Sequence, residues 1–234
     1  TPFTRRRDYA MFSRFPLRIF LDTANVDEIR ESVRMGAISG VTTNPSLAAK
    51  EGIGTSSGYR EAVLEITELV EGPISVEVVS LDTEGMIEEG WGISQWHPNV
   101  VVKLPSTQSG FEAMTHLSRE GVKINQTLCF SVNQAVVGAQ AGASFVSPFV
   151  GRLDDQGLDG MDLVRDIVDV FAKHPIRTQV LAASIRHPLH CLMAAQAGAH
   201  IATIPFKVLG EMIKHPLTDI GVTKFNEDWE KASK

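Results

Sequence analysis

Short apolar runs alternate with longer amphipathic stretches along nearly the whole chain, and this alternation limits the fold more than any other feature. The stretches between the runs have helical periodicity, as in 161–171, where apolar residues recur at the spacing of one helix face. Strands that alternate with helices form right-handed βαβ units and a parallel sheet. The eight predicted strands are 18–22, 39–44, 74–80, 99–105, 123–129, 144–149, 178–184 and 200–205.

Such a sheet either stays open and doubly wound or closes into a barrel. A doubly wound sheet normally has a glycine-rich phosphate loop after its first strand, but FLDTANVDE follows here, and GIGTSSG at 52–58 follows a loop instead of a strand. Eight repeats in a chain of this length fit a (β/α)8 barrel. We therefore predict a single (β/α)8 TIM barrel with a C-terminal helix over residues 17–234, preceded by a flexible extension at 1–16.

Composition excludes several classes of function. The net charge of −6 and the pI of about 5.6 argue against a nucleic-acid binder, and no apolar run approaches the ~18 residues of a membrane span. Cys129 and Cys191 lack CxxC spacing, which favours a reducing cytoplasm over a disulfide framework or a zinc site. His187 and His190 have no acidic third ligand at metal spacing, so we expect surface or capping roles for them and no metal site.

A lysine interrupts the most apolar of the predicted strands. In NVVVKLP at 99–105, Lys103 follows three valines in a strand expected to be buried on both faces. A buried ammonium group is costly unless a carboxylate pairs with it, and burial otherwise favours the uncharged amine. An uncharged amine is a nucleophile for carbonyl carbons. Lys103 therefore has either a structural ion-pair partner or a role in covalent catalysis.

Polar side chains gather where the predicted strands end. In a barrel these ends meet at one mouth, where catalytic groups are found. Any one of the residues could instead cap a helix, and a lone lysine–glutamate pair is often structural. Together, one amine, two carboxylates and several hydroxyls on converging strands favour a catalytic site. The residues are Asp22, Thr42, Asn44, Glu77, Lys103, Asn125, Thr127, Ser147, Ser184 and Arg186.

This set of groups supports Schiff-base catalysis. The amine of Lys103 attacks a ketone, and Glu77 and Thr127 move protons through a water while an iminium forms. Because the iminium withdraws electrons, a carbon–carbon bond two atoms away can break. Asp22, on another strand, is the candidate base for the hydroxyl that becomes an aldehyde.

The sequence resembles the transaldolase family, in the short microbial branch that includes fructose-6-phosphate aldolases. The resemblance rests on IFLDTAN, GVTTNPSL, ISVEVVS, VVKLP, SPFVGRLDDQG and LAASIRHP, and it extends from Ile19 to FNEDWE near the C-terminus. It implies a (β/α)8 barrel and a class I mechanism with neither metal nor cofactor. It assigns the Schiff base to Lys103, acid–base roles to Asp22 and Glu77, and the hydroxyl that holds the catalytic water to Thr127.

The resemblance also implies a set of substrate contacts. A surface ion pair of an arginine with Asp154 or Asp155 is the structural alternative to phosphate binding, for which guanidinium groups are well suited. Lys207, the rival lysine at a strand end, begins a helical stretch and is expected to be solvated or on the phosphate side. Asn44, Asn125 and Ser147, supported by Thr42, match contacts with substrate hydroxyls, and Arg152, Ser184 and Arg186 match the phosphate site.

Two positions separate transferase from aldolase within this family. Its aldolases have tyrosine in place of Phe149 and glutamine in place of Glu77. The tyrosine helps to activate water, so that the enamine is protonated and released, whereas phenylalanine leaves the enamine waiting for an acceptor. The resemblance therefore implies a transaldolase of the pentose phosphate pathway. Such an enzyme moves a dihydroxyacetone unit from sedoheptulose 7-phosphate to glyceraldehyde 3-phosphate.

Three alternatives stay open. They are an aldolase that releases free dihydroxyacetone, a transaldolase for sulfonated sugars, and a non-catalytic phosphosugar-binding barrel in which Lys103 is merely paired with Glu77. The segment KFNEDWEK at 224–231 is expected to be a helix with a buried tryptophan face. The resemblance implies that such helices pack on a neighbouring subunit in pentamers or decamers, and that the other partners are small sugar phosphates.

Overall fold

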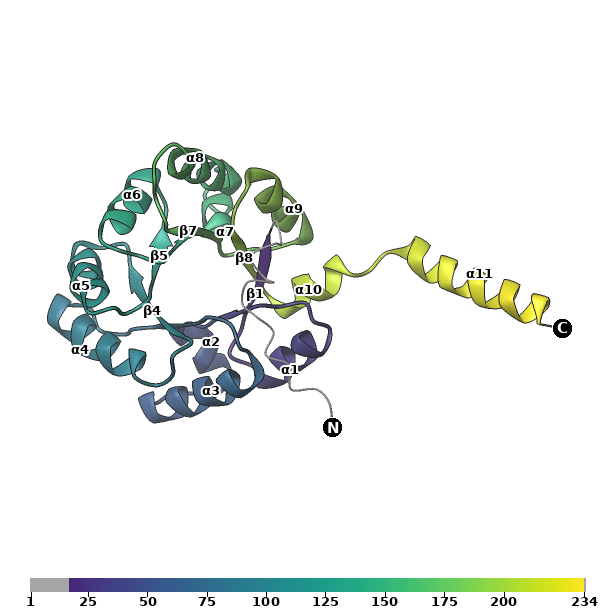
Figure 1. Cartoon of the computed structure of the whole chain (residues 1–234), viewed down its shortest axis with the longest axis horizontal. Helices are drawn as coiled ribbons and strands as arrows, with labels where there is room; N and C mark the ends of the chain where they lie inside the picture. Colours follow the sequence, from purple (N-terminus) through teal and green to yellow (C-terminus); the bar gives the residue numbers. More distant parts are fainter. Residues whose placement is uncertain (1–16, 234) are drawn as a thin grey trace.

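Eight parallel strands close into one barrel in the computed structural model, which describes residues 17–233 (Figure 1). The strands are β1 (Arg18–Asp22), β2 (Val41–Thr42), β3 (Ile74–Glu77), β4 (Val100–Pro105), β5 (Ile124–Cys129), β6 (Phe145–Pro148), β7 (Gln179–Ala182) and β8 (Ile201–Ile204). Leu21 of β1 is in register with Val41 of β2 on one side and with Ile204 of β8 on the other. This closure confirms the predicted (β/α)8 barrel and excludes the open sheet. The extension predicted at 1–16 lies outside the described residues.

Helices connect the strands and surround the barrel. They are α1 (Val26–Arg34), α2 (Pro45–Lys50), α3 (Ser56–Leu69), α4 (Thr83–Ser94), α5 (Gln108–Arg119), α6 (Val132–Gln140), α7 (Val150–Asp154), α8 (Gly160–Ala172), α9 (Pro188–Ala197), α10 (Phe206–Met212) and α11 (Pro216–Ala232). The side chain of Asn25 caps α1 as predicted, and Gly36 follows its end with a φ of 66°. Within residues 17–233, no helix combines the length and apolarity needed to cross a bilayer.

Each predicted strand contains an observed one, but several are shorter than predicted. The run 39–44 contributes only two strand residues, because Asn44 turns to cap α2. The third strand ends at Glu77: the N–H of Val78 still donates to the main-chain oxygen of Lys103, but those of Val79 and Ser80 donate to the carboxylate of Glu89 on α4. The chain therefore leaves the hydrogen-bonded ladder early at the barrel mouth.

An apolar layer fills the interior of the barrel below this mouth. A larger apolar core lies between the strands and the helices, so both faces of each strand are buried and the strands read as nearly continuous apolar runs. Side chains alternate along a strand, so Phe20 faces inward below Asp22, and Val101 faces inward below Lys103. The inner layer thus forms the floor on which the polar groups rest. It comprises Phe20, Val101, Phe145, Leu181, Ala183 and Ile201.

The last helix, α11, projects away from the barrel (Figure 1). It is helical over 224–231 as predicted, but none of its described residues is buried. Trp229 is 75% exposed, so the prediction of a buried tryptophan face is wrong for the single chain. The segment between α10 and α11 carries the helix off the barrel surface, which leaves its apolar side chains uncovered by the described part of this chain.

Candidate active site

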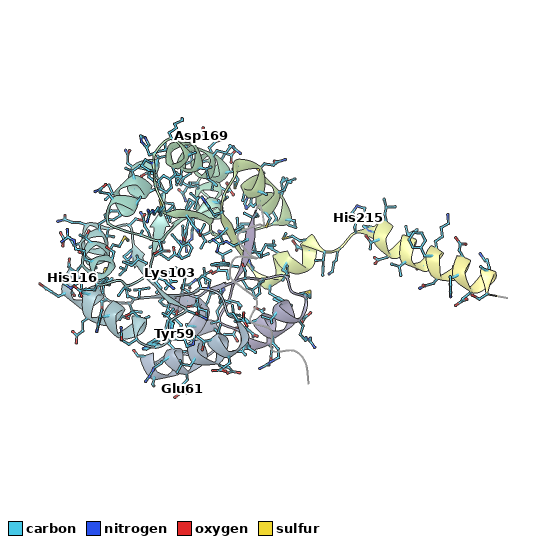
Figure 2. The ribbon with its side chains drawn as sticks, viewed as in Figure 1. Tyr59, Glu61, Lys103, His116, Asp169 and His215 are labelled. Carbon is cyan, nitrogen blue, oxygen red and sulfur yellow. The ribbon has the colours of Figure 1, made fainter. Side chains whose placement is uncertain are left out.

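Lys103 lies near the carboxyl end of β4, and only 4% of its surface is exposed. Its Nζ is 2.9 Å from Oε2 of Glu77 and donates to the main-chain oxygen of Thr43 at 3.1 Å. Glu77 is directly in register with Lys103 on the neighbouring strand β3, so both side chains enter the barrel together. Figure 2 labels Lys103 on the ring of strands. The buried amine therefore has a carboxylate within reach of a single proton transfer.

Asp22 supplies a second carboxylate to the mouth from the end of β1. Its Oδ1 accepts a hydrogen bond of 2.6 Å from Thr42 Oγ1, which is itself 2.6 Å from Thr203 Oγ1 on β8. Because Thr42 gives its only hydroxyl hydrogen to Asp22, Thr203 donates to Thr42. Burial raises the pKa of Asp22 above its ordinary value, and the positive charge of Lys103 and the bond from Thr42 act against this rise. A carboxylate deprived of water in this way is a stronger base than an exposed one.

Buried polar residues link strands β3, β5 and β6. Ser147 Oγ on β6 donates to Asn125 Oδ1 on β5 at 2.6 Å, and Asn125 Nδ2 donates to Ser75 Oγ on β3 at 3.1 Å. These bonds fix the orientation of the Asn125 amide. Thr127, two residues further along β5, has a buried hydroxyl with no hydrogen-bond partner among the described residues. A buried hydroxyl without a partner is uncommon, and this one is available to a ligand.

Backbone strain coincides with this set of residues. In the described part of the chain, Leu128 and Ser184 are the non-glycine residues with left-handed backbone, at φ of 54° and 56°. Leu128 follows Thr127 where the pairing of β5 with β6 shifts register, and Ser184 follows β7. Such conformations cost about 1–3 kcal/mol each and persist where the surroundings enforce them, often at functional sites.

The predicted phosphate-binding residues meet at Gly151. Its N–H donates to the main-chain oxygen of Ser184 at 3.0 Å, and a Cβ at this position would lie 2.4 Å from both that oxygen and Arg186 Nε. Only glycine therefore allows α7 to pack against the loop after β7. Arg152 is exposed and directly follows this contact, so the two arginines flank it.

The guanidinium of Arg186 forms an ion pair with Asp155, at 2.7 Å between Nη2 and Oδ2, and both side chains are half-exposed. This contact is the structural alternative recognised from the sequence, yet the guanidinium keeps further N–H donors for a phosphate.

His190 is held between Arg186 and Asp154. The main-chain N–H of Arg186 donates to Nδ1 of His190 at 3.3 Å, and Nε2 of His190 is 3.1 Å from Oδ2 of Asp154. The predicted surface position of His190 is wrong, because its side chain is buried. It lies beside Asp154, which is 36 positions earlier in the chain. Within residues 17–233, no three His, Cys, Asp or Glu side chains are grouped as metal ligands.

Asn44 and Phe149 lie at the starts of helices. Asn44 Oδ1 accepts an N–H of the first turn of α2 at 3.0 Å, so its amide NH2 group is the part left for a substrate. Phe149 precedes α7, packs on the inner apolar layer and contacts Phe130 edge to face, with ring centroids 5.8 Å apart. The side chain of Lys207 is 87% exposed, which agrees with the solvated role expected for it.

Tyr59 on α3 is a residue of the site that the sequence did not reveal (Figure 2). Thr43 Oγ1 donates to the main-chain oxygen of Ser75 at 2.8 Å, so the phenol of Tyr59 donates to Thr43 Oγ1 at 2.6 Å. Burial raises the pKa of Tyr59 to about 12, against hydrogen bonds with Thr43 and with the main chain of Glu77. Tyr59 thus connects the two residues that contact the amine of Lys103. A lone tyrosine in an amphipathic helix gives no sequence signal of such a role.

Comparison with known proteins agrees with this architecture. The sequence profile of the family described as Transaldolase/Fructose-6-phosphate aldolase matches residues 19–234. A protein named "Probable transaldolase" from Desulforudis audaxviator (strain MP104C) is 57% identical over 218 residues, which cover 93% of this chain and 100% of the relative. One of the same name from Thermoanaerobacter sp. (strain X514) is 56% identical over 216 residues, 92% of this chain and 98% of the relative. The chain therefore belongs to the transaldolase/fructose-6-phosphate aldolase family.

Proposed function

We propose that the chain is a transaldolase that moves a dihydroxyacetone unit from a ketose phosphate to an aldose phosphate through a Schiff base on Lys103. The observation that carries this proposal is the buried amine at the barrel mouth with Glu77 only 2.9 Å away. A second carboxylate, that of Asp22, is close enough for the charge of Lys103 to influence its pKa. A merely structural ion pair would not require this second buried acid.

The reaction begins with a proton transfer from Lys103 to Glu77. The free amine attacks the C2 carbonyl of the ketose, a carbon–nitrogen bond forms, and the former carbonyl oxygen takes up a proton. This hydroxyl leaves as water after a second protonation, and an iminium remains. In this scheme Glu77 exchanges these protons and the hydroxyl of Thr127 holds the water; the 2.9 Å contact of Glu77 with the amine and the unpartnered hydroxyl of Thr127 among the described residues support these roles.

Cleavage of the donor depends on Asp22. Its carboxylate removes the proton of the C4 hydroxyl, the C3–C4 bond breaks, and the bonding electrons move into the iminium to give an enamine. C4 becomes the aldehyde of the departing aldose phosphate. The enamine then attacks the aldehyde carbon of the acceptor, and Asp22 returns its proton to the new hydroxyl. Hydrolysis of the iminium releases the product and regenerates the amine.

Borohydride trapping tests the proposal directly. The protein incubated with fructose 6-phosphate and borohydride should gain the mass of a reduced dihydroxyacetone or ketose adduct, located on the peptide that contains Lys103. A protein that gains no mass, or gains it elsewhere, would be the non-catalytic phosphosugar-binding barrel. Product analysis then compares the reaction with and without an acceptor aldehyde, since an aldolase releases free dihydroxyacetone in its absence.

Phe149→Tyr should increase acceptor-independent release of dihydroxyacetone, by roughly tenfold or more. The new phenol would lie at the mouth, where it can help to protonate the enamine. Phe130→Tyr is the matched control, because it adds the same hydroxyl to the ring that packs edge to face against Phe149. Equal release from both variants, or none from Phe149→Tyr, would contradict the argument that Phe149 preserves the enamine.

Tyr59→Phe should lower kcat about tenfold and leave KM within roughly twofold, because one hydrogen bond of typical strength in this network is lost. The change frees Thr43 and Glu77 to move relative to Lys103, while the ring keeps its contact with Trp96, at 6.3 Å between centroids. Trp96→Phe is the control for packing alone. Steady-state kinetics together with the rate of adduct formation measure the effect, and an unchanged kcat would show that Tyr59 only packs.

The anionic group of the substrate is proposed to bind at Arg152, Ser184 and Arg186. The Asp155 carboxylate now paired with Arg186 would have to share or release that guanidinium. A sulfonate has the same three-oxygen geometry, so a panel of matched phosphate and sulfonate donors decides between a sugar-phosphate and a sulfosugar transaldolase. The reaction as proposed belongs to the cytoplasmic pentose phosphate pathway.

The chain is further proposed to form pentamers or decamers in which α11 packs on a neighbouring copy. Phe225 and Trp229 are 74% and 75% exposed on one side of this helix, a costly arrangement in water. Phe225→Glu/Trp229→Glu should therefore reduce the mass measured by light scattering from that of an oligomer to that of one chain. Thr223→Glu/Lys224→Gln changes the net charge by the same amount on the far side of the helix and should leave the mass unchanged. A wild-type chain that is monomeric would refute the assembly.

A further inference from the structure

A cavity of about 770 Å³ lies at the end of the barrel opposite to the proposed active site. It is bounded by the amino ends of β1, β5, β6 and β7, by the end of α6 and by the loop that leads into β7. The active-site groups described above lie at the carboxyl ends of the strands, so the barrel separates the two regions. The polar part of its lining is Gln140 together with Arg18, Lys123, Ser144, Arg177, Thr178 and Gln179.

The charge of this cavity is opposite in sign to that of the whole chain. Arg18, Lys123 and Arg177 line it, whereas no aspartate or glutamate of residues 17–233 does. None of these three cations forms an ion pair with a carboxylate of residues 17–233. The chain as a whole carries a net charge of −6. Three cations that converge without a counter-charge create a local positive potential in a negatively charged protein.

Arg18 is the best-defined cation of the three. It begins β1 and faces inward like Phe20, with its guanidinium carbon 5.9 Å from the centre of that ring. It donates to Oε1 of Gln179, so this amide oxygen accepts one hydrogen bond from a guanidinium that has five N–H donors. Burial lowers the pKa of Arg18. Burial also lowers the pKa of His200, and the positive charge of Arg18 lowers it further. This partly desolvated guanidinium has no carboxylate partner in the part of the chain that the structure describes.

The other polar groups of the cavity also offer donors. Gln179 uses its carbonyl oxygen on Arg18, which orients its amide N–H groups elsewhere. Lys123 and Arg177 are exposed and can adjust to a ligand, and Lys123 has only a 3.5 Å contact with a main-chain oxygen. The segment 1–16 contains four arginines and a single aspartate, so its sequence adds positive rather than negative charge. The composition of segment 1–16 thus offers no excess of carboxylates to neutralise the cavity.

We propose that this cavity is a second binding site, for a small multiply charged anion of the phosphate class, with Arg18, Lys123 and Arg177 as its cationic ligands. Phosphate oxygens match guanidinium groups in pairs, and three cations balance the charge of a pyrophosphate more fully than that of a single phosphate group. An anion held there would join β1, β5 and β7 at their amino ends. The site uses no residue of the proposed transfer reaction and does not depend on it.

Calorimetric titration with inorganic pyrophosphate tests this site in the full chain. The titration is performed on Arg152→Gln/Arg186→Gln, which removes the arginines of the opposite mouth, so that the remaining binding is assigned elsewhere. Addition of Lys123→Gln/Arg177→Gln should weaken that binding roughly tenfold or more, since two charge-assisted contacts with the anion are lost. Both residues are exposed, so the fold is not at risk. The matched control adds Arg34→Gln/Arg60→Gln, which removes the same charge from exposed positions on α1 and α3.

The outcomes separate a specific site from general attraction. Weakening by Lys123→Gln/Arg177→Gln but not by the control pair supports the site. Absence of pyrophosphate binding in the Arg152→Gln/Arg186→Gln chain, or equal weakening by both pairs, overturns it. Titrations with inorganic phosphate and with fructose 6-phosphate in the same background then distinguish a free anion from a sugar phosphate as the ligand.

Discussion

Lys103→Ala should abolish both turnover and the borohydride-trapped adduct, with activity lowered by at least about 10⁴-fold. The reason is chemical, because no other described amine lies against a carboxylate inside the barrel mouth. Lys207, the other lysine at a strand end, is exposed and only 3.7 Å from Glu211 on its own helix. Kinetics and mass spectrometry of trapped protein measure the two losses together. Lys207→Ala is the matched control and should keep both the adduct and the turnover.

Loss of folding must be distinguished from loss of chemistry in this variant. Removal of one partner of a buried pair leaves Glu77 uncompensated, which typically costs about 3–5 kcal/mol. Lys103→Met/Glu77→Gln removes both charges and keeps the volume, so it should unfold near the wild-type temperature and still form no adduct. A folded double variant that traps substrate would contradict the assignment of the Schiff base to Lys103.

Asp22→Asn should separate imine formation from cleavage. The variant keeps the amine and Glu77, so we expect the trapped adduct to form, while the rate of carbon–carbon cleavage falls about 10²–10⁴-fold with the loss of the base. Single-turnover kinetics resolve the two steps. The wild-type rate should fall in acid as Asp22 is protonated, and this fall should begin at a higher pH than for an ordinary carboxyl, because burial raises the pKa of Asp22. Cleavage at the wild-type rate in Asp22→Asn would refute its role as base.

The same substitution should affect stability in a direction fixed by the raised pKa. Between its ordinary value of 3.8 and the raised value, Asp22 binds more protons in the folded chain than in the unfolded one. The free energy of unfolding therefore falls as the pH rises through this range, and the buried charge costs stability at neutral pH. Asp22→Asn should unfold at a higher temperature than the wild type at pH 7, and this gain should disappear below about pH 4. Asp155→Asn, at a half-exposed carboxylate, is the control.

The sequence was sufficient to predict the barrel and the central pair of the site. Strands buried on both faces are rich in β-branched residues, so all eight were visible as separate runs. Lys103 could be identified because it is a charged residue in an otherwise apolar strand. Glu77 could be identified as an acidic residue near the end of the preceding strand. Such residues can be recognised from the sequence alone, because they differ chemically from their neighbours in the chain.

Several features of the site depend on contacts between segments that no local pattern records. Tyr59 looks like any tyrosine of an amphipathic helix, yet it connects Thr43 with Glu77. Glycine is required at position 151 because a Cβ there would lie 2.4 Å from the main-chain oxygen of Ser184, in the loop after β7.

The alternation of strand and helix patterns, and the polar residue types at the strand ends, by themselves determined the closed barrel and the position of the mouth. Periodicity follows from burial on each element, which is a local property. Tertiary structure alone decided which donor each carboxylate faces, that Trp229 lies away from the barrel, and that Arg18, Lys123 and Arg177 share one cavity. Those outcomes depend on register and closure, which bring residues from distant strands within a few ångströms of each other.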